Sequence, residues 1–225
     1  MTLFGLGLVP CAADIASIVD FRQRAGHLIG GPMLGETTNL PHVSILQCPF
    51  DEDALTQSLL DCIAESWSAN RNCSPVVGHF GPLLYQPVGW VFGPVLPTLM
   101  STETGPWCAD LQRLALERMR SCIDMAQIDV TRDTSQYTTC EREAYLRYGY
   151  RYVGDAFRPH VTLGRISGDT SAPAPELLGL YADSLASRCV TFDRLVFYRA
   201  GEYGVLAEIV RSISVPFEDS GPSLQ

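Results

Sequence analysis

Two short segments of nearly the same sequence stand far apart in this chain of 225 residues. The first, LPHVSILQC, runs from Leu40 to Cys48, and the second, RPHVTLGRI, runs from Arg158 to Ile166. Both are rich in β-branched and apolar residues, which favours a strand. The proline before each histidine cannot donate a hydrogen bond to a sheet, so it fits best where a strand begins. The segments therefore predict two strands, each with a histidine close to a rim that a ligand can reach.

Each segment also carries a hydroxyl residue two positions after its histidine. Side chains two positions apart project from the same face of a strand, so His42 should stand beside Ser44, and His160 beside Thr162. Neighbours of this kind are about 6 to 7 Å apart along the backbone. If the two strands lie side by side, one cleft receives two imidazoles and two hydroxyls.

Such a cleft suits in-line attack on a phosphodiester. Histidine has an unperturbed pKa near 6.5, so one imidazole of a pair can be neutral while the other is charged. The neutral ring takes a proton from water as general base, and the charged ring gives one to the departing ribose oxygen as general acid. The Ser and Thr hydroxyls donate to the non-bridging phosphate oxygens. This chemistry requires no metal and no cofactor, and we expect neither.

A simpler interpretation is that both histidines are ordinary strand residues, because short motifs arise often by chance. Against it, two of only four histidines have this pattern, with Pro before, Val between and Leu or Ile after. The pair PHVSIL and PHVTLG resembles the two His-x-Ser/Thr motifs of the 2H phosphoesterase superfamily, in particular its LigT-like and 2′-5′ RNA ligase-like branch. The first motif has Ser where Thr is commoner in that family, which keeps the hydroxyl.

The resemblance implies a bilobal α+β fold with pseudo-twofold symmetry, in which antiparallel sheets line a central cleft and the helices lie outside. It also implies opening of 2′,3′-cyclic or related 2′-5′ and cyclic phosphates. The catalytic residues would be His42, His160, Ser44 and Thr162, with the two hydroxyls also binding substrate. Two alternatives stay open: RNA end-joining, which is the reverse reaction, and a nucleotide-binding module that uses the same cleft without turnover.

The rest of the sequence predicts helices and strands in an order that fits two halves, each built around one histidine strand. A single bilobal domain should span residues 1–215, followed by a C-terminal tail at 216–225. Around the first histidine strand we expect a strand at about 2–9, a helix at 14–24, a glycine-rich loop, and a helix capped by Asp51 or Asp53 with a buried stripe from Leu55 to Trp67. A meander at 73–95 and a helix over 111–122 should follow. Around the second histidine strand we expect a helix opened by a Thr138–Glu141 capping box, a helix at about 176–186 and a closing hairpin that turns at 201–204.

The amino-acid composition limits which ligands and surfaces the protein is expected to bind. The formal net charge of −9 argues against binding long duplex nucleic acid, because that affinity comes largely from Lys and Arg. A small nucleotide-like cyclic phosphate or a short RNA terminus remains compatible. No apolar run is long enough for a membrane span, and the N-terminal apolar run lacks the basic residues of a signal peptide. The eight cysteines show no Cys-x-x-Cys pair, which favours free thiols in a reducing cytoplasm.

Other candidates carry weaker signals. Tyr203, in the expected hairpin turn, could stack on a base or simply cover the hairpin, and we include it as a substrate-binding candidate. His27 fits a helix C-terminus better than catalysis, and His79 has no hydroxyl two positions on. Arg158 and Arg165 flank the second motif; Arg165 should face away from Thr162 if the strand is regular. The tyrosines at 145, 148, 150 and 152 are expected to pack within a lobe.

Overall fold

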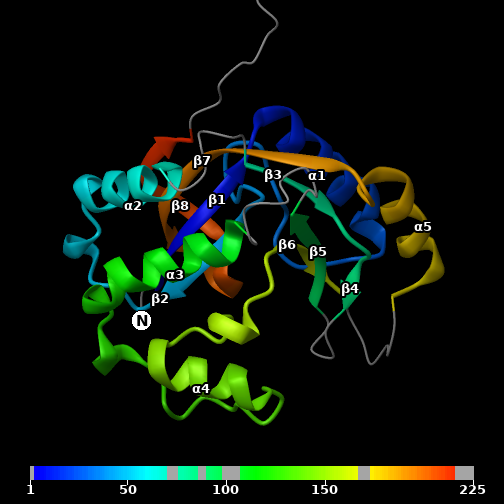
Figure 1. Cartoon of the computed structure of the whole chain (residues 1–225). Coiled ribbons are helices and arrows are strands. Elements are labelled where there is room, and N and C mark those ends of the chain that lie inside the picture. The colour runs from blue at the N-terminus through cyan, green and yellow to red at the C-terminus, as the bar shows by residue number, and fades with distance from the viewer. Residues whose placement is uncertain (1–2, 70–75, 86–89, 98–106, 167–172, 216–225) are drawn as a thin grey trace, which may run out of the picture.

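The computed structural model describes residues 3–69, 76–85, 90–97, 107–166 and 173–215, and all strand pairings among them are antiparallel. This part of the chain is α+β, as the sequence predicts, with helices outside an eight-stranded sheet (Figure 1). The strands are β1 (Leu3–Pro10), β2 (Val43–Cys48), β3 (Val76–Phe80), β4 (Leu84–Tyr85), β5 (Trp90–Pro97), β6 (His160–Arg165), β7 (Cys189–Ala200) and β8 (Leu206–Ser214). The helices are α1 (Ala12–Arg24), α2 (Gln57–Ala69), α3 (Trp107–Met119), α4 (Thr139–Tyr148) and α5 (Pro175–Ser184).

The strand pairings form two groups that share one long strand. In the first group β2 pairs with β1, β1 with β7, and β7 with β8. In the second group β6 pairs with β5, β5 with β3, and β3 with the beginning of β7. The two groups also meet where β2 pairs with β6 at Val43↔Val161. The two histidine segments are thus neighbours in the sheet, although more than 100 residues separate them in the sequence.

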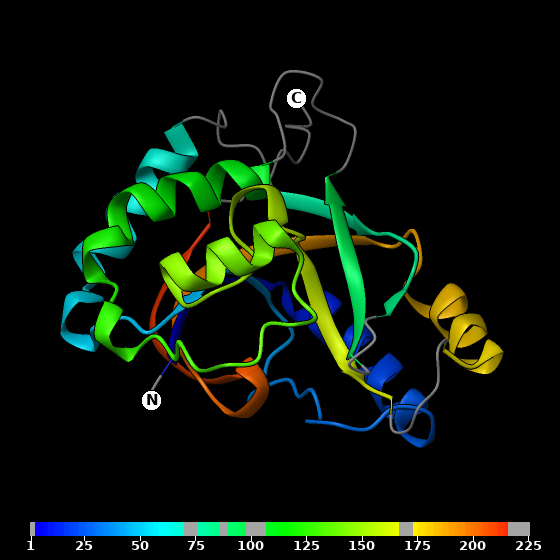
Figure 2. The ribbon, with the colours of Figure 1, turned by 90° about the horizontal axis from the view of Figure 1, so that it is seen from below.

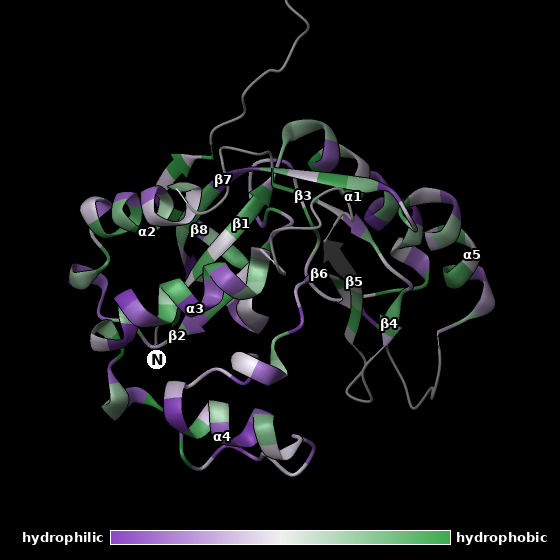
Figure 3. Ribbon diagram, viewed as in Figure 1, coloured by the Kyte–Doolittle hydropathy of each residue, from purple (hydrophilic) through white to green (hydrophobic). Residues whose placement is uncertain are grey.

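The helices are divided between the two groups. Helices α2 and α3 contact each other and lie against β2, β7 and β8, whereas α1 contacts α5 and β6. Figure 2 shows α2 and α3 on one side of the strands and α1 and α5 at the opposite end. The strands between them carry many of the hydrophobic residues, while each helix mixes hydrophobic and hydrophilic residues (Figure 3). The larger of two apolar clusters in the described residues runs through both groups, with members such as Leu6, Ile18, Trp67, Leu111 and Phe192.

Two helix starts illustrate how local sequence sets the boundaries. The Thr138–Glu141 capping box is present: the Thr138 hydroxyl accepts from the Glu141 backbone, and the Glu141 carboxylate accepts from the Thr138 backbone. The expected aspartate cap of α2 is wrong. The Asp51 side chain caps the short 3₁₀ turn Glu52–Ala54, and α2 begins later, where the Thr56 hydroxyl accepts from the Leu59 backbone. Leu55 is accordingly buried just before the helix.

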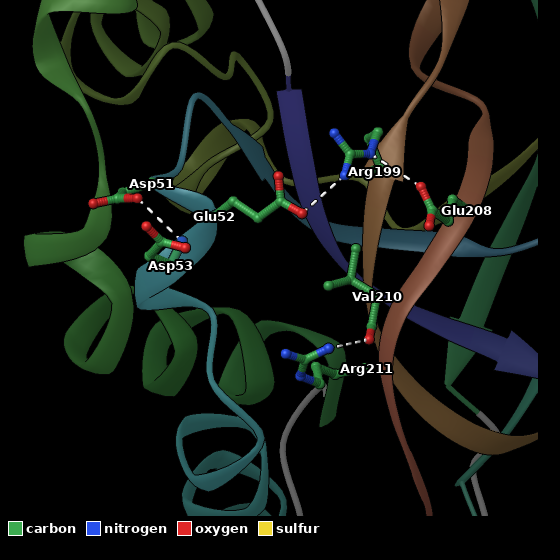
Figure 4. A network of polar contacts seen from close by, with 7 residues as sticks. All are labelled: Asp51, Glu52, Asp53, Arg199, Glu208, Val210 and Arg211. Atoms are coloured by element: carbon green, nitrogen blue, oxygen red, sulfur yellow. Dashed lines mark hydrogen bonds and ion pairs between the residues drawn. The ribbon is translucent and has the colours of Figure 1, made fainter.

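The 3₁₀ turn is fastened to the sheet by an arginine. The Arg199 guanidinium on β7 lies 2.8 Å from a Glu52 oxygen and 3.1 Å from a Glu208 oxygen on β8 (Figure 4). All three side chains are partly exposed, so solvent weakens these pairs and their contribution to stability is small. The network orders the outer edge of the first group and does not reach the histidine strands.

The remaining predicted elements have mixed outcomes. The hairpin is confirmed, with β7 and β8 joined by the turn at Glu202–Gly204. The expected meander includes β3, β4 and part of β5, but residues 73–75 and 86–89 and the tail at 216–225 lie outside the described residues. No helix among the described residues is long and apolar enough to cross a membrane. The seven cysteines in the described part of the chain form no disulfide bonds with one another.

Candidate active site

The four residues of the two motifs line one cavity of about 630 Å³. Val43 and Val161 pair across the junction of β2 and β6, and both valine side chains are completely buried on the core side. Because the pairing is antiparallel, His42 lies across from Thr162, and Ser44 lies across from His160. The predicted convergence of two imidazoles and two hydroxyls is therefore what the fold produces.

Both histidines make the same hydrogen bond to the backbone. The Nδ1 atom of His42 lies 2.9 Å from the carbonyl oxygen of Leu40, and Nδ1 of His160 lies 2.5 Å from that of Arg158. A carbonyl oxygen only accepts, so Nδ1 carries the hydrogen in both rings. In the neutral rings Nε2 then holds the lone pair. Each imidazole is thus held in the tautomer that can take a proton at Nε2 and return it there.

Aromatic rings surround the two imidazoles. His160 packs against Phe92 and Tyr152, with ring centroids 4.3 Å and 5.5 Å away, and His42 lies 4.9 Å from Tyr198. The loss of water around His160 lowers its pKa to about 4, with smaller contributions from the nearby charges of His42 and Arg151. Burial also lowers the pKa of His42 below its ordinary value. Both rings are consequently neutral in the ligand-free protein at pH 7.

A β-bulge follows the hydroxyl residue in both motifs. Along β1, Gly7 pairs with Ser44 and Leu6 with Leu46, which leaves Ile45 as an extra residue. Along β5, Phe92 pairs with Thr162 and Val91 with Gly164, which leaves Leu163 as the extra residue. The bulges occupy equivalent positions, one residue after Ser44 and one after Thr162. This equivalence supports a pseudo-twofold relation between the motif strands that extends beyond their sequence.

A buried glutamine holds the bulge of β2 in place. Gln112, on α3, is 2% exposed, and its Nε2 donates to the carbonyl oxygens of Ile45 and Tyr152 at 2.8 Å each. Its Oε1 accepts from the Gly154 backbone at 2.9 Å. A single side chain therefore joins the bulge after Ser44 to the segment that leads into β6. It fixes the two halves of the site relative to one another.

We expect Gln112→Met, which preserves size and removes the polar atoms, to lower the free energy of unfolding by about 2 kcal/mol, because buried backbone groups lose their partners. Urea unfolding measures the change. Gln127→Met, at an exposed glutamine whose Nε2 bonds only the nearby Asp124 side chain, is the matched control and should shift stability little. Equal stabilities for the two variants would contradict the role given to Gln112.

Tyr198 reaches the site by lying across β1. It belongs to β7, where it pairs with Gly5, and its hydroxyl lies 2.9 Å from the Ser44 hydroxyl on β2. A Cβ at position 5 would overlap the Tyr198 ring, and one at position 7 would lie 3.1 Å from it. The alternating glycines of the first strand thus leave a trough for the ring. Without this trough the phenol could not extend from β7 to β2.

Positive charge enters the cavity from the segment that flanks α4. Arg132 and Arg151 both line the cavity, in a chain whose formal net charge is −9. The Arg151 guanidinium lies 4.8 Å from the centroid of the Tyr137 ring and 4.4 Å from that of Tyr152, and it also donates to the Tyr152 hydroxyl. The same guanidinium lies 3.9 Å from a Glu141 carboxylate oxygen, which offsets part of its charge. The two arginines therefore give the cavity wall a positive contribution that favours an anion, reduced by this ion pair and by Asp133, which also lines the cavity.

Tyr203, the substrate-binding candidate in the hairpin turn, borders the same cavity. It is 55% exposed and lines the cavity with Gly201, Gly204 and Val205. Its backbone is left-handed, with φ of 61°, which is uncommon for a residue other than Gly, Asn or Asp. A hydrogen bond with Glu202 and the negative charge of that residue raise the pKa of its phenol. These observations leave Tyr203 as a candidate for stacking on a ligand.

The other candidates lie outside the cavity lining. His27 is exposed and pairs with Glu176 at 3.0 Å, and His79 is a strand residue of β3. Arg158 is exposed and donates to backbone carbonyls. Arg165 is exposed as expected, but β6 is not regular, so the alternation that set its predicted direction is broken by the bulge at Leu163.

The tyrosine cluster divides in a way that the sequence does not indicate. Tyr145 is buried, with its hydroxyl on the carbonyl oxygen of Asp129, and Tyr148 packs against the core, as expected for lobe packing. Tyr150 packs against the core and Tyr152 is 9% exposed, as expected, but both also line the cavity. Tyr198, Gln47 and Phe92 were also missed. The one available signal was Gly-x-Gly in the first strand, which indicates a close approach of a large side chain.

The described residues contain no group of three or more His, Cys, Asp or Glu side chains that could hold a metal ion. No family model matches the sequence. No curated protein matches it either. The chain is similar in structure to E. coli LigT, in its crystal structure with phosphate, over 96% of this chain and 98% of that chain, with a TM-score of 0.47 and 11% sequence identity.

Proposed function

We propose that this protein is a 2H-type phosphodiesterase that opens cyclic phosphates, such as those of 2′,3′-cyclic nucleotides, without a metal ion. The observation that carries the proposal is the convergence of His42, Ser44, His160 and Thr162 on one cavity. Their pattern resembles the paired motifs of the 2H phosphoesterases. A protein that only binds its ligand would not need two proton-transfer groups held in the same tautomer.

The mechanism follows from the positions of the rings. One imidazole takes a proton from water at Nε2 as the water attacks phosphorus. The other, protonated at Nε2, gives its proton to the leaving ribose oxygen. Ser44 and Thr162 donate to the non-bridging oxygens, whose charge changes in the transition state. Arg132 and Arg151 contribute positive potential along the cavity wall.

We assign the base role to His160 and the acid role to His42. His160 is enclosed by Phe92 and Tyr152 and lies near the Arg151 cation, which disfavours its protonated form. The ring beside His42 is the uncharged phenol of Tyr198, 4.9 Å away, which leaves His42 as the better candidate for the protonated acid. When the anionic substrate binds, it favours the imidazolium of the acid.

The pH dependence is a direct consequence. Catalysis requires one neutral and one protonated ring, and both rings of the free protein have lowered pKa values, with His160 at about 4. We therefore expect kcat/KM to follow a bell-shaped curve with its maximum between pH 4 and 6.5, falling above as the pair loses its remaining proton. The curve for kcat should shift to higher pH, because the bound anion raises the pKa of the acid. A kcat/KM maximum above pH 8 would contradict this account.

The experiment that tests the function is hydrolysis of the four 2′,3′-cyclic nucleotides in excess EDTA, with the products separated as 2′- and 3′-phosphates. We expect turnover to one regioisomer at a rate unchanged by EDTA. Loss of activity in EDTA that returns on adding a divalent cation would contradict the mechanism. Supplying an RNA with a 2′,3′-cyclic end together with one bearing a 5′-hydroxyl measures the reverse, end-joining reaction under the same conditions.

We also propose that the substrate is a small nucleotide or a short RNA end in the cytoplasm. A cavity of about 630 Å³ can hold a nucleotide. The overall negative charge disfavours a long polyanion. Tight binding of a nucleoside monophosphate without turnover of any cyclic substrate would favour the binding-module alternative.

A further inference from the structure

We propose that Gln47 and Tyr198 are positioning residues that make Ser44 a hydrogen-bond donor toward the phosphate. This inference rests on the proposed function. It concerns a chain of three side chains on β2 and β7: the Gln47 amide, the Tyr198 hydroxyl and the Ser44 hydroxyl. The direction of each hydrogen bond in the chain can be derived from the donors and acceptors present.

The Gln47 amide supplies the fixed end. Its Nε2 lies 2.9 Å from the carbonyl oxygen of Gly204 and 3.1 Å from the Tyr198 hydroxyl. A carbonyl oxygen only accepts, so the NH₂ group must face this way. Both of its hydrogens are then in use, one to Gly204 and one to Tyr198. The bulge at Ile45 is what returns Gln47 to the same side of β2 as Ser44.

The hydrogen bond that the Tyr198 hydroxyl accepts determines where it donates its own hydrogen. It is fully buried and accepts from Gln47, so its own hydrogen must go to another oxygen. The Ser44 hydroxyl, 2.9 Å away, is the acceptor present. Burial raises the pKa of Tyr198 to about 12, so the phenol keeps its hydrogen throughout the working pH range.

Ser44 receives that hydrogen bond and keeps its own hydrogen for the cavity. A hydroxyl that already accepts from the protein side is oriented to donate on the open side, where the phosphate binds. Among the residues that the structure describes, Thr162 has no hydrogen-bond partner for its hydroxyl, so the ligand itself must orient it. The two motifs therefore differ in function: Ser44 is a preorganised donor, and preorganised donors give the larger stabilisation of a transition state.

The test is a double-mutant cycle on hydrolysis of 2′,3′-cyclic nucleotides. Tyr198→Phe keeps the ring in its trough and removes the hydroxyl. We expect it to lower kcat about tenfold with little change in KM, the range expected for one transition-state hydrogen bond. In the Ser44→Ala background the same change should have no further effect, whereas in the Thr162→Ala background the tenfold loss should remain.

Tyr181→Phe is the matched control for loss of a buried phenol hydroxyl. Tyr181 is also buried and donates to the carbonyl oxygen of Gly81 at 2.8 Å, on the side of α5 and away from the cavity lining. The Tyr181→Phe variant should lower the free energy of unfolding by about as much as Tyr198→Phe does, and it should leave kcat unchanged. A tenfold loss from Tyr198→Phe that persists in the Ser44→Ala background would overturn the inference, as would no loss at all in the parent protein.

Binding of inorganic phosphate separates this inference from the proposed function. Calorimetric titration of the same variants should show weaker phosphate binding for Tyr198→Phe only when Ser44 is present, because inorganic phosphate carries more charge on its oxygens than the diester substrate and accepts a stronger hydrogen bond. If the parent protein hydrolyses no cyclic nucleotide but shows this coupling, the proposed function fails and the directed chain stands. If the parent hydrolyses the substrate and neither kcat nor phosphate binding shows the coupling, the chain fails and the proposed function stands.

Discussion

Replacement of either His42 or His160 by alanine is expected to lower kcat for cyclic nucleotide hydrolysis by about 10² to 10⁴-fold, the usual contribution of a positioned general acid or base. Both rings line the cavity and present Nε2 while Nδ1 is bound to the backbone. The two losses should not add in the double variant, because attack and departure need the rings together. The rate of product release is measured with the cyclic nucleotide at a saturating concentration, which gives kcat.

His27→Ala is the matched control for these variants. His27 is an exposed imidazole paired with Glu176, and it does not line the cavity, so its removal should leave kcat unchanged. Thermal unfolding of all the variants verifies that they fold. Glutamine at position 42 or 160 supplies a second, polar replacement that cannot transfer a proton at neutral pH. Parent-like rates in both folded single variants would rule out the two-histidine mechanism.

Gly5→Ala is expected to have the largest effect on stability for a single added methyl group. Its Cβ would overlap the ring of Tyr198, which is completely buried across β1 in an apolar cluster with residues such as Val196 and Leu206. Either the ring or the strand must shift, and overpacking of this kind costs about 3 kcal/mol. The displaced phenol would also leave Ser44, so we expect kcat to fall together with the free energy of unfolding. Urea unfolding and the hydrolysis assay measure the two effects.

Two further variants isolate the cause. Gly179→Ala adds the same methyl group in α5, where a Cβ meets nothing within 4 Å, and should stabilise the protein by about 0.5–1 kcal/mol through helix propensity. Tyr198→Leu removes the clashing ring, so Gly5→Ala should destabilise that background much less than it destabilises the parent. A full 3 kcal/mol loss in the Tyr198→Leu background would show that the trough is not the reason for glycine at position 5.

Much of the local structure could be predicted because it depends on near neighbours in the chain. The capping box of α4 is a contact between residues three apart, and the two histidine strands follow from β-branched residues after a proline. The cap of α2 failed for an equally local reason. The Asp51 carboxylate accepts from the backbone of Asp53, which lies before the helix, and the Thr56 hydroxyl caps the helix instead.

The direction of side chains after the motifs could not be predicted, because it depends on how the strands pair. A single extra residue reverses the alternation of a strand. Ile45 and Leu163 are such residues, and nothing in their apolar character distinguishes them from regular strand positions. The bulge at Ile45 brings Gln47 to the cavity. The carbonyl oxygen of Ile45 accepts a hydrogen bond from Gln112, which belongs to a helix that is distant in the sequence.

The sequence by itself determined which groups can do the chemistry: two histidines and two hydroxyls, each pair on one face of a strand because side chains alternate there. Only the tertiary structure decided that β2 and β6 meet at Val43 and Val161, that both imidazoles carry hydrogen on Nδ1, and that Tyr198 crosses β1 to Ser44. The physical reason is that strand pairing, ring tautomer and the packing of a phenol over glycine depend on partners supplied by remote parts of the chain. Such partners become neighbours only when the common core is buried.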